Sequence, residues 1–108
     1  MSPAHRLYAV ITARDGYQCV YCGATEDEEQ LSVDHVVPRI MFRLGTAEGD
    51  MDDPTNLVTA CAGCNGLKRD MPVDVFALYL LTVHGWTAPR ALAMMERVRA
   101  ATARKVSK

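Results

Sequence analysis

Four cysteines form two pairs of identical spacing, Cys19-x-x-Cys22 and Cys61-x-x-Cys64, with 38 residues between the pairs. Two intervening residues let a tight turn direct both sulfurs of a pair at one ion, at about 2.3 Å in a zinc site. The N-terminus carries no apolar segment of the kind that directs secretion, so a reducing compartment is expected. We therefore favour a four-cysteine zinc site over disulfides, and over a redox dithiol at either pair. Four thiolates fill the coordination sphere of zinc, so that ion would stabilise the fold and do no chemistry.

The cysteine pairs adjoin segments whose patterns predict short regular elements. Leu7, Val10 and Ile11 recur at helical spacing, and Asp15-Gly16 is a turn signal that ends this helix before the first pair. Two later runs are rich in β-prone residues, and a proline stops the helix that follows them. The predicted elements are, in chain order, a helix over 3–14, a strand over 31–33, a strand over 57–60 and a helix over 64–70, which Pro72 stops.

The connection between the two predicted strands, residues 36–55, is 20 residues long. Connections of that length without regular structure are usually functional in compact domains. Residues 39–44 within it predict one helical turn, whereas Gly45, Gly49 and residues 50–54 predict turns. The long connection is therefore a candidate part of a functional site.

The C-terminal third predicts two helices. The first follows Pro72, ends at Gly85 and is apolar on nearly all sides, which implies burial or a partner surface. Thr87 is a candidate N-cap of the second helix, and Pro89 suits its first turn. The arginines of this last helix are expected to serve solubility rather than DNA contact. The helix is predicted to place four residues on one stripe: Leu92, Met95, Val98 and Thr102.

Charge is distributed unevenly along the chain, although the net charge is only -1. Residues 24–53 carry nine acidic residues and two arginines, a net charge of -7, whereas residues 71–108 carry +4. A nucleic-acid partner is therefore not supported by the whole-protein charge, but local basic patches can still contact phosphates. Residues 26–29 are all acidic and predict a solvated loop that phosphates would avoid.

Three segments resemble one known family: Asp34-His35-Val36-Val37-Pro38-Arg39, Asn56-Leu57, and Cys61-Ala62-Gly63-Cys64-Asn65-Gly66-Leu67-Lys68. In order and spacing, residues 14–70 resemble the HNH endonuclease family in its four-cysteine, zinc-stabilised form. Asn65 stands where many members have histidine, so the chain is similar to an HNN variant. The resemblance implies an α+β fold with a small ββα-metal core and a four-cysteine zinc site, flanked by an N-terminal helix and two C-terminal helices.

The resemblance also implies a metal-dependent endonuclease that hydrolyses DNA phosphodiester bonds, by nicking or cutting. His35 would be the general base, a role that suits histidine because the neutral imidazole is well populated at physiological pH. Asp34 and Asn65 would hold one Mg²⁺ or Mn²⁺ through oxygen atoms. Asn56 would be the family's structural asparagine, which hydrogen-bonds across the long connection and orients His35.

Two points about the site are left to the tertiary structure. Adjacent residues of a regular strand face opposite sides, so Asp34 and His35 reach one phosphate only if the strand ends or twists there. Four basic residues near the predicted site are either phosphate contacts, which we favour, or ordinary solvated charges. They are Arg39, Arg43, Lys68 and Arg69.

The alternative function is a non-catalytic zinc-knuckle module that binds nucleic acid or protein. A module of that kind needs no base beside a hard-metal site, so the combination of Asp34, His35 and Asn65 favours the nuclease. We interpret residues 1–108 as a single nuclease domain, with its core at about 14–70 and a helical extension at about 72–105.

Location and partners are predicted only broadly. No apolar stretch approaches the ~20 residues of a spanning helix, so we expect no membrane contact and a cytoplasmic protein. The apolar helix that follows Pro72 would suit a homodimer or a larger DNA-processing partner. Domains of the resembling family occur in phage packaging systems, restriction enzymes and mobile elements, and the residues do not choose among these contexts.

Overall fold

A two-stranded antiparallel sheet lies at the centre of the fold. The computed structural model describes residues 3–106, with side chains from Leu7 onward. Strand β1 (Leu31–His35) pairs with β2 (Leu57–Cys61), in a register that sets Leu31 opposite Cys61 and His35 opposite Leu57. Strand β2 is buried along its whole length, whereas β1 is buried only in part. The architecture is α+β, as the sequence predicts.

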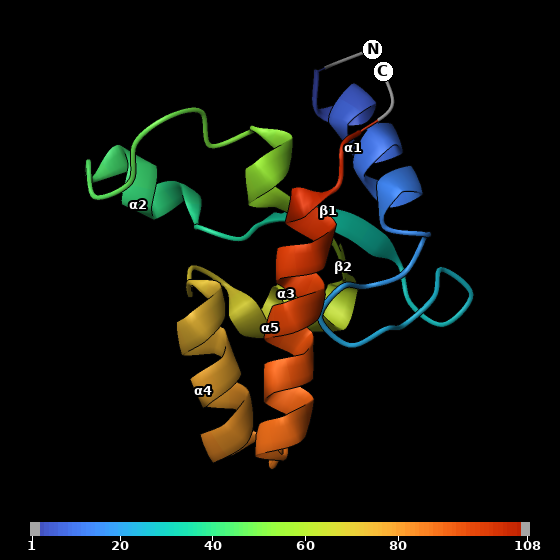
Figure 1. Ribbon diagram of the computed structural model, residues 1–108, viewed down its shortest axis with the longest axis vertical. Coiled ribbons are helices and arrows are strands. Elements are labelled where there is room, and N and C mark those ends of the chain that lie inside the picture. The colour runs from blue at the N-terminus through green and yellow to red at the C-terminus, as the bar shows by residue number, and fades with distance from the viewer. Residues whose placement is uncertain (1–2, 107–108) are drawn as a thin grey trace.

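Five helices and one 3₁₀ turn are described around this sheet (Figure 1). The strands and the helix that directly follows them form the predicted ββα unit. Figure 1 also shows the connection between the strands extending away from the body of the molecule, with a short helix on it. The helical elements are α1 (Pro3–Arg14), α2 (Arg39–Arg43), η1 (Pro54–Asn56), α3 (Ala62–Lys68), α4 (Val73–Val83) and α5 (Ala88–Ala103).

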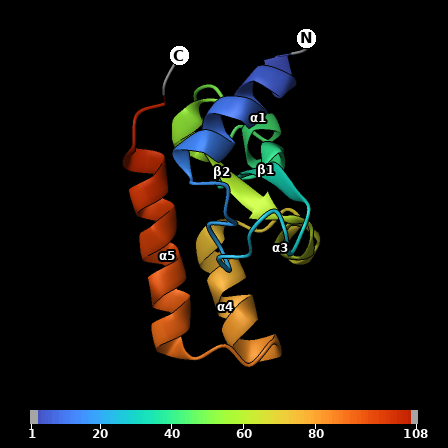
Figure 2. The same ribbon diagram turned by 90° about the vertical axis from the view of Figure 1, so that its right-hand side faces the viewer.

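The C-terminal extension is a pair of helices, α4 and α5, that lie side by side (Figure 2). Gly85 ends the turn after α4 with a φ of +70°, which glycine adopts without strain, and the Thr87 side chain accepts a hydrogen bond from the amide of Arg90. The sequence predicts both the end of the helix at Gly85 and the N-cap at Thr87. Within residues 3–106, no helix combines the length and apolarity needed to cross a bilayer.

The predicted stripe of α5 is wrong at Leu92, whereas Met95 is partly buried against the core. Leu92 is 63% exposed, and Val98 is the one predicted stripe residue that is buried. The helix is rotated so that small residues approach its neighbours, and size-based patterns give such residues little weight. The buried face is Ala91, Met94, Val98 and Ala101.

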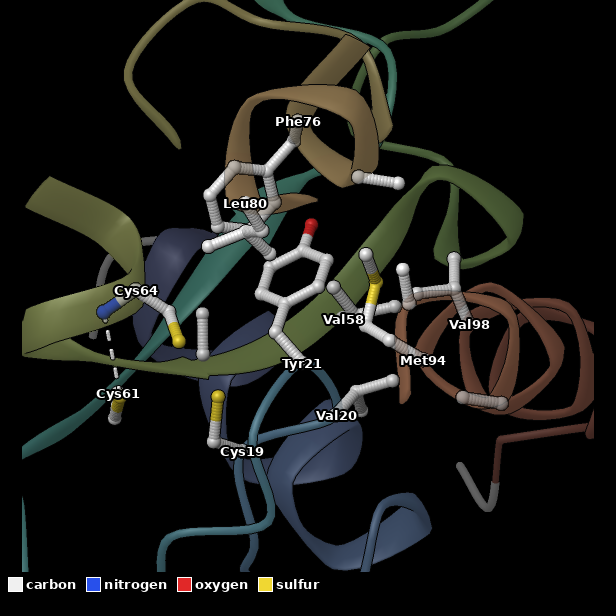
Figure 3. Packing of buried hydrophobic residues seen from close by; sticks show 14 of the residues in the cluster. Cys19, Val20, Tyr21, Val58, Cys61, Cys64, Phe76, Leu80, Met94 and Val98 are labelled. Atoms are coloured by element: carbon white, nitrogen blue, oxygen red, sulfur yellow. Dashed lines mark hydrogen bonds between the residues drawn. The ribbon is translucent and has the colours of Figure 1, made fainter. Parts of the chain in front are cut away.

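The core joins the C-terminal helices to the first cysteine pair. Figure 3 shows Tyr21 amid this cluster, with Phe76 and Leu80 on one side and Met94 on another. The Tyr21 ring meets the Phe76 ring edge-on, with centroids 5.4 Å apart. Since Tyr21 lies between Cys19 and Cys22, packing of α4 and α5 also holds the first cysteine turn in place.

Helix α1 anchors the end of the long connection through its last residue. The Arg14 guanidinium donates to the carbonyl oxygens of Pro54, at 2.9 Å, and Leu57, at 2.6 Å. It also pairs with Asp15, whose Oδ2 accepts from the amide of Thr59 at 2.8 Å. Both side chains are almost fully buried. This ion pair fixes the point where the connection re-enters the sheet.

Candidate functional site

The four cysteines converge from two distant segments, as predicted. Their sulfur atoms all lie within 4.8 Å of one another. In each pair the amide of the second cysteine donates to the sulfur of the first, Cys22 to Cys19 at 3.5 Å and Cys64 to Cys61 at 3.4 Å. Cys61 is also the N-cap of α3, so that helix begins at Ala62, two residues earlier than predicted. Two turns of this kind facing each other form one cluster of four thiols.

The chemistry of this cluster fits zinc. The thiol of Cys64 donates to Cys19 and holds the pKa of Cys19 near 5, although burial opposes the shift. Burial raises the pKa of Cys61 to about 12, and the same contact with Cys19 raises the pKa of the Cys64 thiol. Without a cation, the protein therefore favours a negative charge at Cys19 and protons at Cys61 and Cys64. A divalent cation would compensate the charge of all four thiolates, and a set of four soft sulfur donors suits Zn²⁺.

Two contacts that the sequence did not reveal support the cysteine turns. The guanidinium of Arg97 on α5 donates to the carbonyl oxygens of Val20, at 3.0 Å, and Tyr21, at 2.7 Å. Glu29 accepts from the amide of Gly63 at 2.9 Å. Arg97 is thus a structural contact rather than a solubilising charge, and at least one residue of the acidic loop contacts the second cysteine turn.

Asp34 lies in a polar cluster beneath the first cysteine turn. Its Oδ2 atom accepts from the hydroxyl of Tyr21 at 2.6 Å and lies 2.8 Å from the ammonium of Lys68. The side chain of Lys68 is fully buried, and that of Asp34 is 11% exposed. Burial, followed by the negative charge of Asp34, raises the pKa of Tyr21 well above its ordinary value. The phenol therefore stays protonated and remains a donor to the carboxylate.

His35 follows at the end of β1 and turns toward the long connection. Its Nε2 atom lies 2.8 Å from Oδ1 of Asp52, 17 residues further along the chain. Its carbonyl oxygen accepts from the Lys68 ammonium at 2.8 Å. Asp52 was not predicted, and no local pattern distinguishes it from Asp50 and Asp53, which lie in the same acidic turn.

Asp34 and His35 nevertheless line one surface hollow of about 180 Å³. Both residues belong to β1, where Asp34 pairs with Val58 and His35, the last residue of the strand, pairs with Leu57. The approach of both side chains to one phosphate stays a prediction. The hollow is lined by Asp34, His35, Pro38, Arg39, Arg69 and Asp70.

Asn56 closes the base of the long connection, as the resemblance implies. Its side-chain oxygen accepts from the amide of Val37 at 2.8 Å. Its side-chain nitrogen donates to the carbonyl oxygens of Val37, at 3.1 Å, and Met51, at 3.0 Å. One amide group thus bridges the outgoing and returning arms of the connection, close to both His35 and Asp52.

Asn65 lies on α3 next to the same strand but does not line the hollow. Its side-chain nitrogen donates to the hydroxyl of Ser32 at 2.5 Å. Ser32 and Asp34 are two residues apart and share one face of β1. Asn65 therefore lies on the side of the strand that carries Asp34, with its carbonyl oxygen left as a possible ligand.

The oxygen donors near the hollow fit a small hard cation. Mg²⁺ and Mn²⁺ prefer carboxylate and carbonyl oxygens, and keep several water ligands. Both contacts of Asp34 fall on Oδ2, and no hydrogen bond to its Oδ1 is present within the described residues. Asp34 could therefore bind a cation without giving up its contacts with Tyr21 and Lys68.

The four predicted phosphate contacts separate in the structure. Arg39 and Arg69 are exposed and line the hollow, whereas Arg43 is exposed on the connection outside it. Lys68 is buried and paired, so it differs from the prediction of a surface contact. Arg69 ends α3 with a φ of +49°, a left-handed backbone that is unusual outside glycine and is found disproportionately at functional sites.

Comparison with known proteins gives the following relatives. A family model described as HNH endonuclease matches residues 19–70. The CRISPR-associated endonuclease Cas9 of Corynebacterium diphtheriae is 33% identical over 64 residues, which are 59% of this chain and 5% of that protein. The corresponding Cas9 of Actinomyces naeslundii is 34% identical over 62 residues, again 5% of that protein. The chain therefore spans a small fraction of the relatives that it matches.

A solved structure has a similar fold. The crystal structure of the Type II-C Cas9 enzyme from Actinomyces naeslundii superposes with a TM-score of 0.59 and 24% sequence identity. The match covers 96% of this chain and 12% of that one. At this identity the likeness concerns the fold, and it includes the C-terminal helices as well as the ββα unit.

Proposed function

Because residues 19–70 match the HNH endonuclease family, we propose that this chain hydrolyses phosphodiester bonds of DNA with His35 as the general base. The observation that supports this proposal most strongly is the shared hollow. Asp34, whose carboxylate could hold a cation, and His35, whose imidazole could take a proton, are among the residues that line the same small cavity, together with two arginines. General-base catalysis and phosphate binding both require this proximity.

The proposal assigns roles to four residues of the hollow, and to Asn65 and Arg43 outside it. The imidazole of His35 takes a proton from a water molecule, whose oxygen then attacks phosphorus. Asp34 and the carbonyl oxygen of Asn65 would hold one Mg²⁺ or Mn²⁺. When bound, that ion would stabilise the charge on the departing 3′ oxygen. Arg39 and Arg69 would bind the flanking phosphates, and Arg43 would extend this contact along the connection.

The scaffold and the site are connected in this proposal. Tyr21 belongs to the first cysteine turn, and its hydroxyl contacts Asp34. Zinc at the four cysteines would therefore fix Tyr21 and, through it, the carboxylate of Asp34. The zinc ion itself, closed by four thiolates, would remain structural.

Plasmid nicking by zinc-loaded protein tests the proposed activity. Wild type should cut with Mg²⁺ or Mn²⁺ and not with EDTA, and His35→Ala should lower the rate by about 10²–10⁴-fold, the usual contribution of a general base. His84→Ala is the matched control, since His84 is exposed at the end of α4. Equal cutting by wild type and His35→Ala would refute the assignment.

The same samples distinguish the nuclease from a binding module. If the protein binds DNA in a mobility-shift assay but does not cut it with any metal ion, that result would favour a non-catalytic zinc-knuckle module. The two Cas9 relatives are far longer than this chain, so contact with a larger DNA-processing partner, like the homodimer, stays a prediction.

A further inference from the structure

The long connection returns a carboxylate to the imidazole of His35. Oδ1 of Asp52 lies 2.8 Å from Nε2, with the His35 side chain 13% exposed and that of Asp52 46% exposed. We propose that Asp52 is a positioning residue for the general base, a role that rests on the nuclease function proposed above. It holds the imidazole in one orientation and in one tautomer.

The tautomer follows from hydrogen-bond chemistry. A carboxylate only accepts hydrogen bonds, so the ring nitrogen facing Asp52 must carry the proton. Nδ1 of the neutral ring then keeps its lone pair and is the atom that takes a proton from water. After that transfer, the O–H bond of water is broken and Nδ1 carries a new N–H bond. The resulting imidazolium still donates Nε2–H to Asp52, whose negative charge stabilises it.

The path of the connection makes this pair specific. Asn56 donates to the carbonyl of Met51, the residue before Asp52, and exchanges hydrogen bonds with Val37, two residues after His35. The side chain of Asn56 thus holds two residues, Met51 and Val37, that lie close in sequence to Asp52 and His35. An additional contact fixes the turn, since the amide of Asp52 donates to Oδ1 of Asp50 at 2.9 Å.

The two neighbouring carboxylates, Asp50 and Asp53, contact groups other than the imidazole. Asp53 caps the 3₁₀ turn η1, where its Oδ1 accepts from the amide and the hydroxyl of Thr55. Asp50 accepts from the backbone of the turn. Among the three acids of this turn, Asp52 alone contacts the imidazole. Asp53, one residue away and with the same side chain, therefore provides a control position.

The direct test is the ¹⁵N spectrum of the His35 ring in zinc-loaded, magnesium-free protein at neutral pH. Wild type should show the Nε2–H tautomer, and Asp52→Ala should lose the preference for it. Asp53→Asn, which removes one charge from the same turn, should leave the tautomer unchanged. Because no substrate or catalytic metal is present, this measurement is independent of whether the protein cuts DNA.

Kinetics supply the second readout. We expect Asp52→Ala to lower kcat roughly 10- to 100-fold, the range found when the hydrogen-bond partner of a metal-ligating histidine is removed, with KM for DNA nearly unchanged. Asp52→Glu should restore part of kcat, and Asp53→Asn should match wild type. An unchanged tautomer in Asp52→Ala, or an unchanged kcat, would overturn the role of Asp52. Full cutting by His35→Ala would instead overturn the nuclease mechanism and leave the tautomer result standing.

Discussion

The ammonium of Lys68 lies 2.8 Å from the carboxylate of Asp34 and 2.8 Å from the carbonyl oxygen of His35. One buried cation thus contacts two consecutive residues of the proposed site. The ammonium also lies 5.9 Å from the centre of the Tyr21 ring, which adds a weaker attraction. Lys68 therefore connects α3 to the end of β1, and its charge compensates Asp34 where solvent access is small.

Removal of this buried cation should destabilise the fold. Lys68→Met keeps most of the side-chain length but leaves Asp34 without its counter-charge, so we expect a loss of roughly 3–5 kcal/mol in the free energy of unfolding. Urea denaturation measures it. Lys105→Met is the matched control, since Lys105 is exposed. Addition of Asp34→Asn to Lys68→Met should restore part of the loss, and equal effects of the two lysine variants would contradict the ion pair.

The structural asparagine should be sensitive to an isosteric change. Asn56→Asp keeps the acceptor for Val37 but replaces the donor to two carbonyl oxygens with a negative oxygen. We expect unfolding to become easier by roughly 1–3 kcal/mol, because these carbonyls lose their partner. The cutting rate should fall by more than the added fraction of unfolded protein explains, since both arms of the connection carry site residues. An unchanged urea midpoint and unchanged cutting would argue against the bridge.

Zinc removal should unfold the protein, whereas magnesium removal should not. Structural zinc in small sites contributes on the order of 10–16 kcal/mol of apparent binding free energy, more than the stability of most small domains. A strong chelator, or Cys22→Ser, should abolish the native circular dichroism spectrum. A weak chelator that removes only magnesium should stop cutting and leave that spectrum intact. A native spectrum in zinc-free Cys22→Ser would contradict the four-thiolate site.

Two arginines on α5 should differ in their effect on stability. Arg97→Ala removes hydrogen bonds to the first cysteine turn and should cost roughly 1–2 kcal/mol, with easier loss of zinc to a chelator. Arg99 pairs with Glu96 on the exposed surface, so Arg99→Ala should change stability by less than about 0.5 kcal/mol. Thermal melts and a zinc-release assay measure both. Equal behaviour of the two variants would indicate that Arg97 does not support the turn.

Alkaline pH should weaken the fold through Tyr21. Burial and the charge of Asp34 raise the pKa of Tyr21 in the folded state, whereas the unfolded phenol ionises near pH ~10. The stability from this group is therefore complete below about pH 10 and is lost as the pH rises toward the higher folded pKa. Urea midpoints at pH 8 and 10.5 should fall less in Tyr21→Phe than in wild type. Equal falls would indicate that Tyr21 is not the sensitive group.

Much of the fold was predictable because its signals are local. The turn at Gly85, the cap at Thr87 and the long connection between two strands each depend on a few neighbouring residues. The start of α3 was placed too late because a cysteine sulfur, rather than the usual side-chain oxygen, accepts the capping hydrogen bond. The buried face of α5 was misplaced because its small residues give little pattern, and because the neighbours of that helix are distant in sequence.

The sequence by itself determined the chemical groups of this protein: four thiols in two turns, an Asp-His pair and two asparagines at family spacing. Only the tertiary structure decided that Asp34 and His35 share a hollow, that Lys68 of α3 is buried against both of them, and that Asp52 contacts the imidazole. The physical reason is that spacing fixes which atoms a short turn can present. A contact across the long connection depends on the path that Asn56 holds, and the burial of a charge depends on the packing around it.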